Sequence, residues 1–159
     1  MIYKSKVMSG KRDRQFFFEV KLNWFSGTRG LLTAKGASGA IQVATPPEFG
    51  GEANSWSPEH LFLSSIIGCF MSTYMAFAKK LAFEILKLEC SAIGQIEIIE
   101  GKYKFTHINL YPQLYVADDA VKEKAVKALE KTQHSCLISN SVSAAILYHS
   151  EILIEPLHL

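Results

Sequence analysis

The sequence has little arginine and no excess of either charge. Only Arg12, Arg14 and Arg29 occur among its 17 basic residues, and the formal net charge is +2. Without a basic stripe along one segment, we expect no nucleic-acid partner. Any role that needs a flat, bidentate and permanently charged donor has few candidates.

Cysteine is also scarce, and we expect no export signal. The three cysteines, Cys69, Cys90 and Cys136, lack the close spacing of a disulfide scaffold or of a CxxC zinc site. The N-terminus has no apolar segment followed by a small-residue cleavage site. We therefore expect a cytoplasmic protein without a membrane partner, whose thiols are reduced at rest.

One long apolar segment, Leu61–Ala78, is a marginal candidate for a membrane span. Its serines, threonine and glycine dilute its hydrophobicity and favour close packing against protein. A helix that is apolar on all sides belongs in a core, so we expect a central buried helix. Ser57 suits its N-cap, Pro58 its first position and Glu59 the positive end of its dipole.

The rest of the chain alternates like strands around a second helix. Phe16 to Trp24 alternates apolar and polar residues, which predicts a half-buried strand. A loop rich in proline and glycine follows. We predict a single α+β domain over residues 1–159. The further predicted elements are strands at 31–36, 40–45, 85–92 and 152–154, a hairpin at 94–116 turning at Glu100–Gly101, and a helix over 118–133.

The surroundings of the cysteines differ. Cys69 lies within the apolar helix, where a buried thiol is most often inert. Cys136 follows the second helix in a polar, turn-forming segment, and we expect it to be accessible; Cys90 is assigned to the core. Cys69 becomes reactive only with a cation and a partner thiol nearby. Arg29 is the candidate for the cation, and Glu59 is the candidate for the acid that holds this arginine in one orientation.

Three motifs together resemble one known family. "GTRG", "SPEHLFLSSIIGCF" and "HSCLISNSV", in this order, are similar to the osmotically inducible protein C and organic hydroperoxide resistance (OsmC/Ohr) family, from about Lys21 to about Val142. The resemblance implies an antiparallel sheet wrapped around a central buried helix, with a second helix, in an intertwined homodimer. We place the chain in the broader OsmC-like branch.

The resemblance also implies an activity, a thiol peroxidase that reduces organic hydroperoxides without a cofactor or metal. Cys69 matches the cysteine that attacks the peroxide and becomes a sulfenic acid, and Cys136 matches the one that then forms a disulfide with it. Arg29 matches the arginine that stabilises the thiolate, and Glu59 the glutamate that holds it. The reductant implied is an external dithiol, such as a lipoyl protein.

Helix geometry adds an argument for a dimer. Glu59 and Cys69 are ten positions apart, about 15 Å along one straight helix. Either the helix breaks near Ser64–Gly68, or Arg29 and Glu59 reach Cys69 from a second subunit. We expect the second arrangement, a twofold dimer.

Two departures from the family pattern leave the substrate open. Leu137 stands where the hydroperoxide-resistance subgroup has proline, and His60 stands where an amide is common. Candidates for an apolar substrate pocket are Phe25, Trp56, Phe62, Phe70 and Met71, for each of which plain core packing is the alternative.

Two other functions stay open. One is a small-ligand-binding protein without peroxidase activity. The other, weaker, is a metal site formed by Cys69, His107, His134 and Cys136. His134 otherwise suits the negative end of the second helix.

Overall fold

The computed structural model describes residues 14–155, which form two compact units divided between Trp56 and Ser57. The single domain predicted over residues 1–159 stays a prediction. Most of the N-terminal segment used to argue against an export signal, with Arg12, lies outside the described residues.

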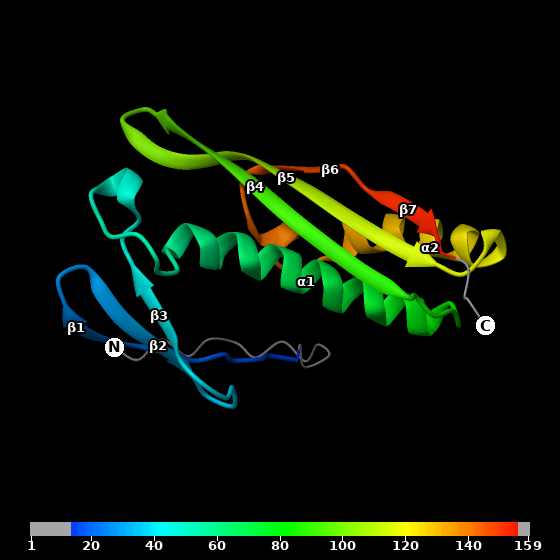
Figure 1. The fold of residues 1–159 in the computed structure, drawn as a ribbon, viewed down its shortest axis with the longest axis horizontal. Coiled ribbons are helices and arrows are strands. Elements are labelled where there is room, and N and C mark those ends of the chain that lie inside the picture. The colour runs from blue at the N-terminus through cyan, green and yellow to red at the C-terminus, as the bar shows by residue number, and fades with distance from the viewer. Residues whose placement is uncertain (1–13, 156–159) are drawn as a thin grey trace, which may run out of the picture. The chain divides into compact units, whose positions relative to one another are not determined.

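The first unit is a three-stranded antiparallel sheet in the order β1-β2-β3. Figure 1 shows these strands in blue and cyan. Gly27 has a φ of 50° in the turn between β1 and β2, a conformation that glycine adopts without strain, and the Trp24 indole donates to its carbonyl at 2.9 Å. The predicted strands are present, although the first begins after Phe16 and Phe18. The elements are β1 (Val20–Ser26), β2 (Arg29–Ala34), β3 (Ile41–Ala44) and the 3-10 helix η1 (Pro47–Phe49).

The apolar face of β1 is exposed, contrary to the half-burial that we expected. Val20, Leu22 and Trp24 are 65%, 59% and 69% exposed. The alternation of residue types therefore predicted the strand correctly but not what covers it. Nothing in the described part of the chain buries this face.

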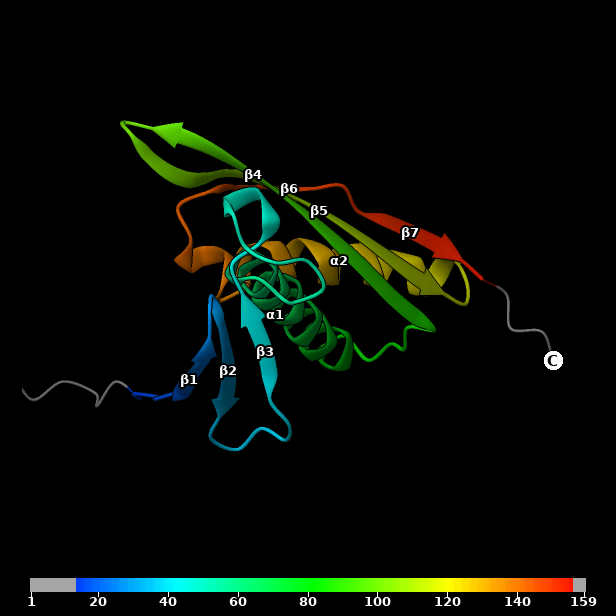
Figure 2. The same ribbon diagram turned by 60° about the vertical axis from the view of Figure 1, so that its left-hand side comes forward.

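The second unit is a mixed sheet with two helices. The predicted hairpin turn is confirmed: β4 and β5 join through Glu100 and Gly101, both with positive φ. Figure 2 shows both helices on the same side of the sheet. The elements are α1 (Pro58–Lys80), β4 (Lys87–Ile99), β5 (Lys102–Val116), α2 (Asp119–Ser135), the 3-10 helix η2 (Ser139–Ser141), β6 (Ala145–Tyr148) and β7 (Glu151–Ile154).

The last two strands make the sheet mixed rather than wholly antiparallel. Both β6 and β7 pair parallel with β5. The sequence predicted β7 but not β6, whose residues AILY are apolar throughout and show no alternation. The long connection through α2 allows the chain to return to β5 in the parallel direction.

Helix α1 begins where the sequence predicted. Ser57 accepts a hydrogen bond from the His60 amide, and the His60 ring accepts one from the Ser57 amide at 3.2 Å, so the two residues form a reciprocal cap. The helix continues without a break from Pro58 to Lys80. This continuity excludes the first of the two arrangements considered for Glu59 and Cys69, a break in the helix near Ser64–Gly68.

Only one stripe of α1 is buried, whereas we expected burial on all sides. Ile66, Phe70, Tyr74 and Ala78, spaced by four residues, are buried against the sheet and α2. The reason is that the sheet and α2 cover this stripe alone. By length and composition α1 would also suffice to cross a membrane, but core helices of soluble proteins satisfy the same criterion.

Candidate functional site

Cys69 lies on α1 beside the buried stripe and is half-buried. The Ile138 amide donates to its Sγ at 3.5 Å, and Thr73 Oγ1 lies 4.0 Å from the same sulfur. Cys136 is its neighbour in the fold, and the Cys136 thiol helps to lower the pKa of Cys69. The structure therefore brings together two thiols that are 67 positions apart (136 minus 69).

Cys136 is fully buried, although the sequence led us to expect an accessible thiol. It forms the C-cap of α2, where its amide donates to the Thr132 carbonyl at 3.0 Å. The chain then turns back in η2, and the Asn140 amide donates to the Cys136 carbonyl at 3.0 Å. The polar composition of this segment indicated a turn correctly, but the turn folds over the thiol.

The pKa values of the two thiols are shifted in opposite directions. Burial raises the pKa of Cys69, but hydrogen bonds from the Ile138 amide, the Cys136 thiol, the Thr73 hydroxyl and the Leu137 amide outweigh it, so the net pKa is lowered. Burial raises the pKa of Cys136, and the neighbouring Cys69 raises it further, while hydrogen bonds from Ser139 offset part of the rise. Cys69 is thus the thiol that ionises first.

Sequence reasoning missed three contributors to this site. Tyr148 Oη donates to Ser139 Oγ at 3.3 Å, and Ser139 in turn lowers the pKa of Cys136. Leu137 contributes its backbone N–H to Cys69. The only sequence signal was the polar segment around Ser139, because neither a backbone donor nor the distant Tyr148 leaves a local pattern.

The predicted arginine and glutamate lie in different units. In the first unit, Arg29 forms an ion pair with Glu52. In the second unit, the Oε2 atom of Glu59 is buried and has no hydrogen-bond partner among the described residues. The predicted roles of Arg29 and Glu59 beside Cys69 stay predictions.

The five candidate pocket residues have different environments. Phe70 is fully buried between Tyr74 and Tyr148, which is the core packing left open as its alternative. Phe25 and Trp56, in the first unit, are about half exposed, as is Met71 on α1.

Phe62 lines a cavity in the second unit. Its ring lies 4.8 Å from that of Phe105, and both border an open cavity of about 340 Å³. The remaining lining residues are Lys104 and the segment 141–144, which begins at the end of η2.

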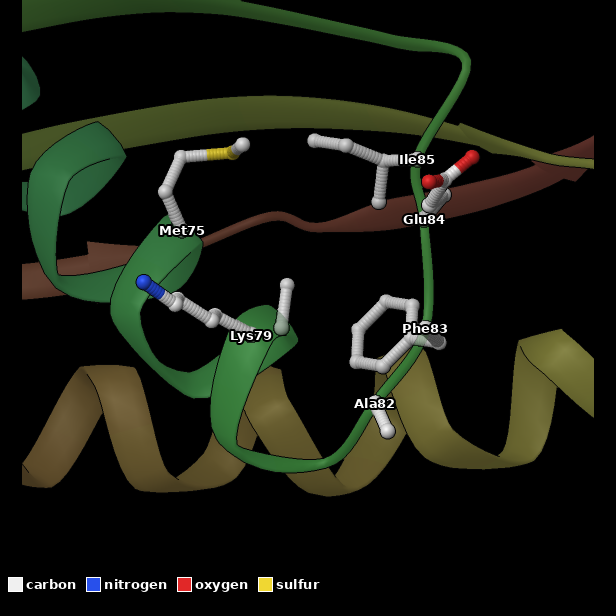
Figure 3. A pocket seen from close by; sticks show the side chains of 7 residues that line it. Met75, Lys79, Ala82, Phe83, Glu84 and Ile85 are labelled. Atoms are coloured by element: carbon white, nitrogen blue, oxygen red, sulfur yellow. The ribbon is translucent and has the colours of Figure 1, made fainter.

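A larger pocket of about 530 Å³ lies at the C-terminal end of α1 and contains no thiol. Figure 3 shows Met75 and Ile85 pointing toward one another across it, with Phe83 on the connection that follows the helix. Lys79 and Glu84 supply its charged groups. It is an apolar pocket separate from the cysteine pair.

The metal-site alternative finds no support in the described residues, where no three histidine, cysteine or acidic side chains are grouped to hold an ion. His107 hydrogen-bonds to Thr106, and the His134 carbonyl accepts from Asn140. Cys90 is half-buried on β4, where burial raises its pKa. Its sulfur donates to the Ser91 carbonyl at 3.7 Å and makes no hydrogen bond to Cys69 or Cys136 among the described residues.

Comparison with known proteins identifies the fold and the family. Residues 51–149 match the model of the family described as OsmC-like protein. An uncharacterised protein of Methanocaldococcus jannaschii is 31% identical over 130 residues, 80% of this chain and 64% of its own length. The chain thus spans less than two thirds of that relative.

Solved structures of similar fold point to the same group. An OsmC-like protein of unknown function from Vibrio cholerae has a TM-score of 0.74 at 18% identity, over 87% of this chain and 100% of its own. An organic hydroperoxide resistance protein from Elizabethkingia anophelis has a TM-score of 0.69 at 19% identity, over 89% and 99%. At these identities the likeness concerns the fold alone. The family match covers more than half of the sequence, and the chain belongs to the OsmC-like family.

Proposed function

We propose that the protein is a thiol peroxidase that reduces organic hydroperoxides to alcohols. The observation that carries this proposal is the closeness of Cys69 to Cys136, beside the Ile138 amide that donates to Cys69 Sγ at 3.5 Å. These groups, with Thr73 and Leu137, lower the pKa of Cys69. A thiolate is the nucleophile in peroxide reduction, and a nearby second thiol allows reversible chemistry. Some relatives of similar fold are named organic hydroperoxide resistance proteins.

The reaction uses two electrons from each thiol pair. The Cys69 thiolate attacks the outer oxygen of the hydroperoxide, the O–O bond breaks, and the alkoxide takes a proton to leave as the alcohol. The resulting Cys69 sulfenic acid is attacked at sulfur by Cys136. The S–S bond forms, the S–O bond breaks, and hydroxide leaves as water after taking a proton.

An external dithiol completes the cycle. It reduces the disulfide by thiol–disulfide exchange and becomes a disulfide itself, which returns Cys69 and Cys136 as thiols. A lipoyl-bearing protein fits this role because its two thiols close a ring on oxidation.

We further propose that the active form is a homodimer in which Arg29 and Glu59 complete the site. Glu59 has a buried, unpartnered carboxylate oxygen, which a guanidinium would satisfy. The unbroken helix α1 places Glu59 about 15 Å from Cys69 along its axis, so one copy's pair would serve the other copy's thiol.

The direct test is peptide mass mapping after one equivalent of cumene hydroperoxide. We expect a Cys69–Cys136 disulfide in the unmodified protein, and a trapped Cys69 sulfenic acid in Cys136→Ser. Cys69→Ser should consume no peroxide. Cys90→Ser is the matched control, because Cys90 lies outside the pair and its loss should leave peroxide consumption unchanged.

If the Cys69 thiol survives a small excess of the hydroperoxide unmodified, the peroxidase proposal is wrong.

The alternative, a small-ligand-binding protein, is favoured by the pocket in Figure 3, which is apolar and holds no cysteine. A binder would consume no peroxide with or without Cys69.

A further inference from the structure

Four side chains from four elements gather around the two thiols. Tyr148 Oη, at the end of β6, donates to Ser139 Oγ in η2 at 3.3 Å. Ser139 lies in the turn that follows Cys136, where the Asn140 amide donates to the Cys136 carbonyl at 3.0 Å, and its hydroxyl and amide lower the pKa of Cys136. The Cys136 thiol in turn lowers the pKa of Cys69. The four residues come from α1, the C-cap of α2, η2 and β6.

The direction of the hydrogen bonds follows from the number of hydrogens available. A serine hydroxyl carries one hydrogen, so a hydroxyl that accepts from Tyr148 has its own hydrogen free to donate onward. The Cys136 thiol likewise donates its single hydrogen to the Cys69 sulfur when Cys69 is ionised. The Tyr148 and Ser139 hydroxyls can therefore both donate in the direction of Cys136.

This direction matters because Cys136 is fully buried. A buried thiolate has no water to stabilise it, so it needs protein donors already in place. In the reduced protein, the negative charge on Cys69 opposes a second charge on Cys136. Oxidation of Cys69 removes that charge, while the two donors of Ser139 remain.

We propose that Ser139 and Tyr148 are positioning residues for the second thiol, Cys136. Tyr148 orients the Ser139 hydroxyl toward Cys136. This donor allows Cys136 to ionise in place once Cys69 has been modified. The inference deepens the proposed function and depends on its assignment of Cys136 as the resolving cysteine. In this step Cys136 loses its proton and attacks the Cys69 sulfur. The new S–S bond forms as the group on Cys69 leaves with the electron pair of its bond to sulfur.

The test uses an aromatic disulfide reagent, dithionitrobenzoate, in place of peroxide, with the full chain in a Cys90→Ser background. Cys69 attacks the reagent, forms a mixed disulfide and releases one coloured thiolate. Cys136 then attacks the Cys69 sulfur and releases a second coloured thiolate from it. The two releases report the two thiols separately and require no peroxidase activity.

We expect Ser139→Ala to leave the first release unchanged and to slow the second about tenfold at neutral pH, the effect of one lost hydrogen bond to a charged group. The pH profile of the second release should move to higher pH. Tyr148→Phe should act in the same direction with a smaller effect, because the Ser139 hydroxyl remains but loses its orientation. Ser139→Thr, which keeps a hydroxyl, should restore the rate.

Matched controls come from the same elements. Ser141→Ala removes another η2 hydroxyl, which donates to the Leu137 carbonyl at 2.8 Å, and Tyr111→Phe removes a phenol from the neighbouring strand β5. Both should keep the pH profile of the second release.

The outcomes separate this inference from the peroxidase proposal. A second release in Ser139→Ala with the original rate and pH profile overturns the role of Ser139 and Tyr148. A slowed second release in Ser139→Ala, together with no consumption of cumene hydroperoxide by the parent protein, overturns the peroxidase proposal and supports the positioning role.

Discussion

At the scale of single residues, the feature that decides the chemistry is that the pKa values of two neighbouring thiols are shifted in opposite directions. The pKa of Cys69 is lowered from 9.0, whereas that of Cys136 is raised. Alkylation by iodoacetamide requires the thiolate, so its rate follows ionisation. We expect the alkylation of Cys69 to rise with pH to a midpoint below 9.0, and that of Cys136, which its burial also slows, to a midpoint above it.

Peptide mass spectrometry after short exposures between pH 6 and 10 would measure both profiles. A Cys69 midpoint at or above that of Cys136 would contradict the assignment of Cys69 as the attacking thiol.

The backbone amide of Leu137 is a second residue-scale prediction. Leu137→Pro removes an N–H that helps to lower the pKa of Cys69. Cys136, with φ −65° and ψ 115°, already has the extended conformation that precedes proline. We expect the fold to persist, the pKa of Cys69 to rise, and its alkylation rate at neutral pH to fall by up to about tenfold.

Leu137→Ala is the matched control, since it keeps the N–H while it shortens an exposed side chain. Equal alkylation profiles for the proline and alanine variants would show that this amide does not act on Cys69.

At the scale of elements, close packing between β4 and β5 fixes the sheet over α1. An added Cβ at Gly94 would lie 2.5 Å from Phe105 Cε1 and 3.0 Å from Leu63 Cδ2, both inside normal contact. We expect Gly94→Ala to lower the free energy of unfolding by about 1–3 kcal/mol, measured by urea denaturation.

Gly68→Ala is the control for this substitution. A Cβ at Gly68 meets no atom within 4 Å, and alanine favours a helix over glycine by about 1 kcal/mol. We therefore expect this variant to be as stable as the original protein or more so. An unchanged stability in Gly94→Ala would refute the tight contact.

The sequence predicted elements well where a local pattern was long enough. The N-cap at Ser57, the helix that follows it and the Glu100–Gly101 turn are each specified by residues within a few positions of one another. It missed β6 because the residues AILY do not alternate, and it missed the parallel pairing with β5 because that is a long-range contact. Burial was predicted least well, as β1 and α1 show.

At the scale of the whole molecule, the exposed apolar face of β1 favours association of two copies. Val20, Leu22 and Trp24 are each more than half exposed, and contiguous apolar surface of this kind marks an interaction site. We expect a solution mass of twice 17.7 kDa by light scattering coupled to gel filtration.

Val20→Asp should weaken this association, because a charge placed in an apolar interface is costly to bury. Lys21→Asp, the neighbouring position on the opposite face of β1, is the control for the added charge. A mass equal to one chain for the unmodified protein would contradict the dimer.

The sequence by itself determined the residue types, the main helices and strands, and, through a resemblance to the family, the two cysteines that we assign to the chemistry. Tertiary structure alone decided that Cys136 is buried, that Leu137, Ser139 and Tyr148 contribute to the site, and that the last strands run parallel to β5. The physical reason is the distance along the chain over which each kind of interaction acts. Caps, turns and periodicity act over a few positions, whereas burial and hydrogen bonds between thiols 67 positions apart depend on the path of the whole chain.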